Sequence, residues 1–167
     1  MKRWKGVCFL TLLVLADQAT KLVAVAHLDP DPNGTAVRIL RGAVYLKISR
    51  NAGGVWGLLE GLGPAFFIIA TALVAGFLAT LLLRLREADR PFAAPLLLLL
   101  GGFIGNGIDR ARFGHVVDFI YMTWYSRFMI STFNLADLAI LAGLAWTIVL
   151  YLSRAARSRR AAHAGAS

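Results

Sequence analysis

The segment FAAPLLLLLGGFIGNGIDR, residues 92–110, decides the fold of this chain. It carries no charge from Phe92 to Ile108 and then reaches Asp109 and Arg110. A helix needs about 20 mostly apolar residues to cross the hydrocarbon core of a bilayer, and this run is close to that length. We therefore predict a membrane-spanning helix that ends in two charged residues.

Three further segments of similar length and character lie along the chain, at residues 6–26, 64–83 and 133–152. Together with residues 92–110 they predict a four-helix membrane bundle in a single domain of 167 residues. The composition agrees: 58% of the residues are hydrophobic and the mean hydropathy is +0.66. Soluble domains contain only roughly 45–50% apolar residues.

Basic residues lie next to these segments in a pattern that predicts their orientation. Ten of the 18 Lys and Arg residues lie before the first segment, between the second and third, and after the fourth. All these positions are on one side, which the positive-inside rule assigns to the cytoplasm. We therefore expect a multi-pass membrane protein with both termini in the cytoplasm. Because this pattern explains the net charge of +9, we expect no nucleic-acid partner.

The two other connections, residues 27–63 and 111–132, are then expected outside the membrane. Apolar and polar residues alternate from Val37 to Ser49, which predicts a small β-sheet within residues 37–60. Residues 111–132 are rich in aromatic side chains, which predicts a segment that lies in the outer interface. The single cysteine, Cys8, excludes an internal disulfide and a multi-cysteine metal site.

Ionisable side chains inside membrane spans are costly, at about 2.5–3.5 kcal/mol each, and usually carry function. Here they are Asp17, Lys21, Asp109 and Asp137. At a rise of about 1.5 Å per residue, Asp109 lies about 27 Å and Asp137 about 26 Å from the cytoplasmic boundary. Asp17 lies deeper, at about 18 Å by the same rise. We therefore expect Asp109 and Asp137 at one level, near the outer leaflet.

Each of these two acids follows an asparagine by three residues, Asn106 or Asn134, a spacing that favours a shared hydrogen-bond network. Two neighbouring carboxylates share a proton, so one can activate water while the other polarises a peptide carbonyl, without a metal or other cofactor. Alternatively, each acid forms a buried ion pair with a basic residue such as Lys21 or Arg110, and spacing alone leaves both interpretations open. For Asp17 and Lys21, four residues apart on one helix, mutual neutralisation is favoured.

Glycines form a bare face on the predicted third span. They are Gly101, Gly102, Gly105 and Gly107. Such a face favours the close approach of neighbouring helices and also leaves space for a peptide chain. We therefore expect a substrate chain to lie along it.

Five short motifs occur in order along residues 17–140. They are Asp17-Gln18-Ala19-Thr20-Lys21, Arg50-Asn51-Ala52-Gly53, Gly105-Asn106-Gly107-Ile108-Asp109-Arg110, Val116-Val117-Asp118-Phe119 and Phe133-Asn134-Leu135-Ala136-Asp137. In this order and spacing they resemble the motifs of the lipoprotein signal peptidase (signal peptidase II) family. The resemblance implies an all-α membrane protein, a four-transmembrane-helix bundle with a small extracytoplasmic β-cradle and an interfacial periplasmic helix.

The resemblance also implies an activity and a site. The activity is that of an aspartyl endopeptidase of the bacterial inner membrane that is sensitive to globomycin. It cleaves bacterial prolipoproteins just before the diacylglyceryl-modified cysteine. Asp109 and Asp137 are implied as the catalytic pair. The residues implied to bind substrate or to support the pair are Asp17, Lys21, Asn51, Gly53, Asn106, Arg110, Asn134 and Ala136. We expect a monomer in contact with membrane lipids.

Two other functions compete with this one. A membrane subunit could use its buried acids as an ion or proton relay, although a relay predicts acids at staggered depths. An inactive relative could bind lipoprotein precursors without cutting them. A cleavage assay with a lipidated precursor separates all three.

Overall fold

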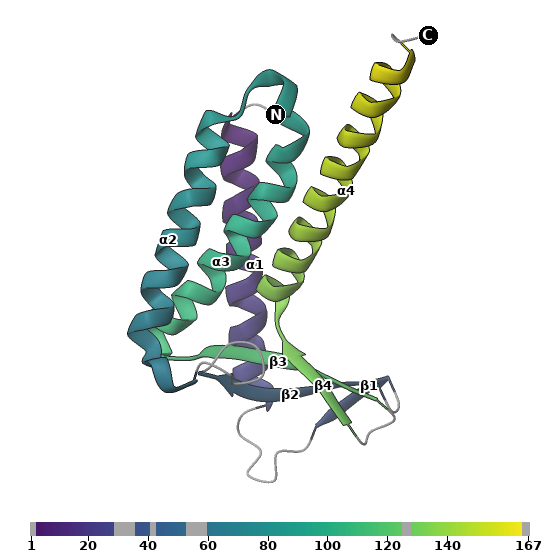
Figure 1. Cartoon of the computed structure of the whole chain (residues 1–167). Coiled ribbons are helices and arrows are strands. Elements are labelled where there is room, and N and C mark those ends of the chain that lie inside the picture. The colour runs from purple at the N-terminus through teal and green to yellow at the C-terminus, as the bar shows by residue number, and fades with distance from the viewer. Residues whose placement is uncertain (1–2, 29–35, 41–42, 53–59, 125–127, 165–167) are drawn as a thin grey trace.

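The computed structural model describes residues 3–28, 36–40, 43–52, 60–124 and 128–164. Within them the chain forms four long helices and a four-stranded antiparallel sheet that lies across one end of the helices (Figure 1). The helices are α1 (Arg3–Leu28), α2 (Gly63–Arg84), α3 (Ala93–Phe113) and α4 (Leu135–Ala164). Each helix is long and apolar enough to span a membrane, which confirms the predicted four-helix membrane fold.

Local sequence explains where α2 begins and where α3 ends. Pro64 follows the first residue of α2, where its fixed φ suits the first helical turn. α3 stops at Gly114, whose φ of 76° is the left-handed conformation that glycine adopts without strain. The Gly114 N–H donates to the carbonyl of Arg110, which caps α3 and sends the chain directly into the sheet.

The central helix is α3, which packs against α1, α2 and α4. A methyl group added to Gly101 or Gly105 would collide with side chains of α1. One on Gly102 would meet the backbone of α4, and one on Gly107 would meet Thr71 of α2. The predicted close packing is thus confirmed, but other helices cover these glycines. The expectation that a substrate chain lies along this face is therefore wrong.

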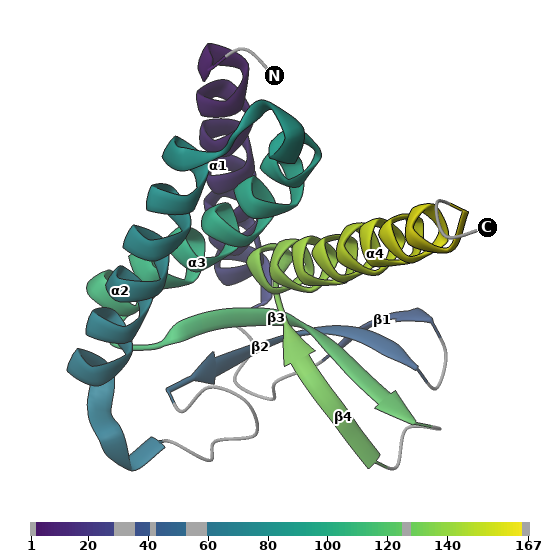
Figure 2. The same cartoon turned by 45° about the horizontal axis from the view of Figure 1, so that its top comes forward.

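The sheet has the strand order β1-β2-β3-β4, and every neighbouring pair is antiparallel. Its strands are β1 (Val37–Leu40), β2 (Val44–Asn51), β3 (Val116–Trp124) and β4 (Phe128–Phe133). Figure 2 shows that β3 comes from α3 and that β4 leads into α4. The sheet therefore joins both predicted outer connections into one layer below the helices.

The two outer connections differ in how far the structure matches the prediction. The strands β1 and β2 lie where alternation predicts them, whereas residues 53–59, including Gly53, lie outside the described residues. Residues 111–132 are predicted as an interfacial segment, but their described part completes α3 and forms β3 and most of β4. Residues from Val116 to Thr123 are mostly β-branched or aromatic, and β2 supplies their backbone hydrogen bonds, so a strand is favoured over an interfacial helix.

The start of α1 and the end of α4 lie at the end of the bundle opposite the sheet, as does the turn η3 (Glu87–Phe92) between α2 and α3 (Figure 1). At that end an ion pair joins Arg154 of α4 to Asp89 of η3. This arrangement places the basic clusters on one side and the sheet on the other, as the charge pattern predicts.

Candidate active site

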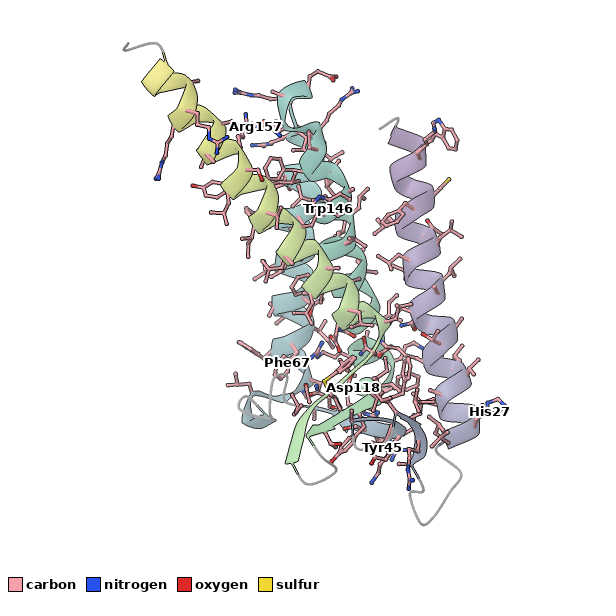
Figure 3. The ribbon with its side chains drawn as sticks, turned by 90° about the vertical axis from the view of Figure 1, so that its right-hand side faces the viewer. His27, Tyr45, Phe67, Asp118, Trp146 and Arg157 are labelled. Carbon is pink, nitrogen blue, oxygen red and sulfur yellow. The ribbon has the colours of Figure 1, made fainter. Side chains whose placement is uncertain are left out.

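The buried polar side chains of the described residues gather where the sheet meets the helices, and Figure 3 shows Asp118 at this junction. The first element of the site is the start of α4. The Asn134 side-chain oxygen accepts a hydrogen bond from the Asp137 N–H at 3.0 Å, and Asp137 Oδ2 accepts one from the Asn134 N–H at 3.2 Å. This reciprocal pattern is a capping box, so the Asn-x-x-Asp spacing both begins the helix and fixes the Asp137 carboxylate.

The second element is Asp118 on β3, which is fully buried. Its Oδ1 accepts a hydrogen bond from Asn134 Nδ2 at 2.7 Å. Its Oδ2 accepts one from Asn51 Nδ2 at 3.1 Å and one from Thr132 Oγ1 at 3.2 Å. Burial and then the negative charge of Asp137 raise the pKa of Asp118 to about 6, although these hydrogen bonds oppose the shift. Asp118 and Asp137 therefore interact as a pair of like charges.

Two asparagines connect these carboxylates. Asn106 Nδ2 donates to Asp137 Oδ1 at 2.7 Å, while Asn106 Oδ1 accepts from Asn134 Nδ2 at 3.1 Å. Because Asn134 Nδ2 also donates to Asp118, a continuous network runs from one acid to the other. The shared network predicted for Asn134 and Asp137 is present, whereas Asn106 hydrogen-bonds to Asp137 on α4 instead of to its neighbour Asp109.

Asp109 belongs to a different cluster. Its carboxylate forms an ion pair with Lys21 at 2.8 Å and accepts hydrogen bonds from Gln18 at 2.9 Å and from the Val117 N–H at 3.1 Å. Lys21 also pairs with Asp17 at 2.8 Å, as the spacing of four residues predicts. Among the described residues, no hydrogen bond joins Asp109 to Asp137.

This geometry changes the candidate pair. The ion-pair interpretation that spacing left open applies to Asp109, whose side chain is 1% exposed and paired with a cation. Asp137 is only partly buried and interacts electrostatically with Asp118. The structure therefore favours Asp118 over Asp109 as the partner of Asp137. The sequence signal for Asp118 is the single acid in Val116-Val117-Asp118-Phe119, but this acid lies outside the predicted spans and so escapes the depth argument.

The remaining predicted residues have distinct positions. Asn51 ends β2 and binds Asp118, and the Ala136 N–H donates to Asp17 Oδ1 at 2.9 Å. The Arg110 guanidinium lies over the Phe67 ring at 5.0 Å, and its buried Nε has no hydrogen-bond partner. In the described part of the chain, no group of three His, Cys, Asp or Glu residues is arranged to hold a metal ion.

Known proteins resemble this chain in sequence and in fold. A family model described as signal peptidase (SPase) II matches residues 9–153. The lipoprotein signal peptidase of Anoxybacillus flavithermus is 35% identical over 146 residues, which cover 85% of this chain and 84% of that protein. The lipoprotein signal peptidase of Halalkalibacterium halodurans is 36% identical over 150 residues, covering 90% and 91%. A bacterial membrane enzyme solved by the in meso method at 2.3 Å resolution is similar with a TM-score of 0.79 at 27% identity, covering 92% of this chain and 90% of that one.

Proposed function

Because the chain belongs to the signal peptidase II family, we propose that it is an aspartyl endopeptidase of the inner membrane. Its relatives are lipoprotein signal peptidases, so its substrates are prolipoproteins from which it removes the signal peptide. We place the cut just before the diacylglyceryl-modified cysteine. The observation that carries the aspartyl mechanism is the pair Asp118 and Asp137, linked by Asn106 and Asn134.

The position of this pair suits such a substrate. Asp137 lies in the first turn of α4 and Asp118 on the adjoining strand, so both lie at the junction of the helices and the sheet. A lipid-modified cysteine keeps its acyl chains in the membrane, which holds its peptide bond near the headgroups. Water is available at that level, and hydrolysis requires it.

The surroundings of the two acids suggest different roles. Asp137 retains exposed surface, so we assign it the role of the base that takes a proton from the attacking water. Asp118 is fully buried and has a raised pKa, so we assign it the proton that polarises the scissile carbonyl. The water oxygen then bonds to the carbonyl carbon, and the leaving amine takes the proton from Asp137 as the peptide bond breaks. Since Asp118 is covered, the side chains above it must move when the peptide binds.

The test is a cleavage assay on the purified full-length protein in detergent micelles. The probe is a synthetic precursor peptide with a diacylglyceryl cysteine, and the same peptide without the lipid is its control. Mass spectrometry should find one cut, just before the modified cysteine, and globomycin should inhibit it. A folded protein that binds the lipidated peptide but leaves it intact contradicts the proposal and favours an inactive precursor-binding relative.

The raised pKa of Asp118 predicts a pH-dependent cost in stability. A folded-state pKa of about 6 against an ordinary value of 3.8 means that ionisation is harder in the folded protein. The contribution of protonated Asp118 to the free energy of unfolding is therefore fully present below about pH 4, and it is lost as the pH rises through 6. At about 1.4 kcal/mol per pKa unit, the loss is on the order of 3 kcal/mol.

We expect Asp118→Asn to remove this dependence. The free energy of unfolding of the unmodified protein, relative to the variant, should fall between pH 4 and pH 6–7. Denaturant titrations in detergent micelles, followed by tryptophan fluorescence, measure this difference at each pH. Acids that do not interact with Asp118 cancel in the comparison, and the coupled titration of Asp137 is part of the measured difference. A difference that stays constant from pH 4 to pH 7 contradicts the raised pKa.

A further inference from the structure

A buried cluster of three charges lies on the α1 side of the proposed catalytic pair. Lys21 Nζ lies 2.8 Å from Asp17 Oδ2, 2.8 Å from Asp109 Oδ2 and 3.0 Å from Asn106 Oδ1. An ammonium group has three hydrogens, so these three acceptors satisfy it completely. Gln18 Nε2 also donates to both acids, at 3.2 Å to Asp17 and 2.9 Å to Asp109. The cluster is therefore closed and leaves no donor of Lys21 for a ligand.

Each acid of the cluster holds the backbone just before one member of the catalytic pair. Asp17 Oδ1 accepts the N–H of Ala136, the residue before Asp137, at 2.9 Å. Asp109 Oδ2 accepts the N–H of Val117, the residue before Asp118, at 3.1 Å. The first N–H groups of a helix have no partner within the helix, so Asp17 also satisfies the start of α4 from another helix.

We propose that Asp17, Lys21 and Asp109 form a positioning clamp that sets the separation of Asp118 and Asp137. Lys21 ties the two acids together, and each acid ties down one backbone position next to the pair. The proposal rests on the assignment of Asp118 and Asp137 as the catalytic pair. Of the two roles expected for Asp17 and Lys21, substrate binding or support of the pair, it assigns them support, because their exposed fractions are 1% and 3%.

Lys21 also orients Asn106. With its oxygen facing Lys21 and Asn134 Nδ2, the Asn106 amide must direct its NH₂ group toward Asp137 Oδ1. A flipped amide would place donors against donors and an oxygen against a carboxylate. The clamp therefore controls the backbone before each acid and one hydrogen bond to Asp137.

Gly105 offers a way to disturb the clamp without removing a charge. A methyl group at Gly105 would lie 2.5 Å from Asp17 Oδ2, too close for any real contact, so the Asp17 carboxylate must move. Gly76 on α2 is the matched control, because a methyl group there meets nothing within 4 Å. Gly105→Ala and Gly76→Ala therefore make the same chemical change in two helices, and only the first disturbs the clamp.

We expect Gly105→Ala to lower kcat by about 100-fold, since a 1 Å displacement in an active site can have that effect. Here kcat is calculated from the concentration of protein that binds the peptide. KM for the lipidated peptide should change by less than about threefold, because the clamp does not touch substrate. The pH profile of the rate should shift, since the separation of two acids sets their coupling. A simple loss of folded protein would scale the profile at every pH without shifting it. Gly76→Ala should leave all three quantities unchanged.

Two outcomes overturn the clamp. One is a raised KM with unchanged kcat, which assigns the cluster to substrate binding. The other is an unchanged kcat and pH profile. If Gly105→Ala does not fold, Asp17→Asn replaces it with the same expected results, because it breaks the ion pair at constant size. If Asp118→Asn is active, the catalytic pair itself is refuted. If Asp118→Asn is inactive but the clamp variants behave like the unmodified protein, only the clamp is refuted.

Discussion

Asp118→Asn and Asp137→Asn should each lower the rate of prolipoprotein cleavage by about 1,000-fold or more. Each substitution keeps the size of the side chain but removes a group that exchanges a proton during hydrolysis, and such groups contribute up to about 10⁴-fold. The measurement is the initial rate of cleavage of the lipidated precursor peptide by purified protein. Binding of the same labelled peptide should persist in both variants, because neither change removes the fold.

Two comparison variants make this result specific. Asp89→Asn also removes an acid, but one that is paired with Arg154 at the opposite end of the bundle. This variant should cleave at the normal rate. Asp109→Asn distinguishes the pair Asp118 and Asp137 from the pair Asp109 and Asp137. If Asp109 is a clamp residue, this variant should lower kcat by about 100-fold, a smaller decrease than in Asp118→Asn. If Asp118→Asn cleaves normally while Asp109→Asn is inactive, the pair predicted from the sequence is correct and the one favoured by the structure is not.

The helices were predictable because each is encoded locally. A run of apolar residues specifies a membrane span without reference to the rest of the chain, and α1 to α4 overlap the four predicted segments. The ion pair of Asp17 and Lys21 was predictable for the same reason, since one helical turn separates them. These features depend only on spacing within one element.

The pair that we propose as catalytic was not predictable in the same way, because it depends on the sheet. Depth along a helix axis places Asp109 and Asp137 at one level but says nothing of the direction in which each side chain points. On α3, Asp109 points toward Lys21 of α1. Asp118 reaches the site because β3 pairs with β2, a contact between segments about 70 residues apart. Residues 111–132 were instead predicted as an interfacial segment, because they are rich in aromatic side chains.

Asn134 is the residue through which the two halves of the site act together. Its Nδ2 donates to Asp118 Oδ1, to Asn106 Oδ1 and to the Val117 carbonyl, while its Oδ1 caps α4 through the Asp137 N–H. The side chain is completely buried, so none of these partners can turn to water instead. A site of two acids is thus held by an uncharged group that donates on one side and accepts on the other.

Asn134→Asp should therefore be the most damaging substitution of constant size. An ionised carboxylate keeps the oxygen that caps α4 but has no hydrogen to donate, and it places a further carboxylate against Asp118 and Asp137. Each buried acceptor left without a donor costs about 1–3 kcal/mol, so the free energy of unfolding at pH 7 should fall by roughly 3–5 kcal/mol. Cleavage at pH 7 should be lost together with the stability.

Acidification distinguishes this cause from a general packing defect. As the pH falls, the new carboxyl group at position 134 takes up a proton and regains one donor, so the stability of the variant relative to the unmodified protein should rise toward pH 5. Asn134→Ala lacks both the donor and the cap, and its relative stability should show no such recovery. Denaturant titrations of both variants from pH 5 to pH 7.5 measure the difference. Equal pH dependence of stability in the two variants would show that the Asn134 donor does not hold the two carboxylates. Asn134 would then not be the residue that links Asp118 to Asp137.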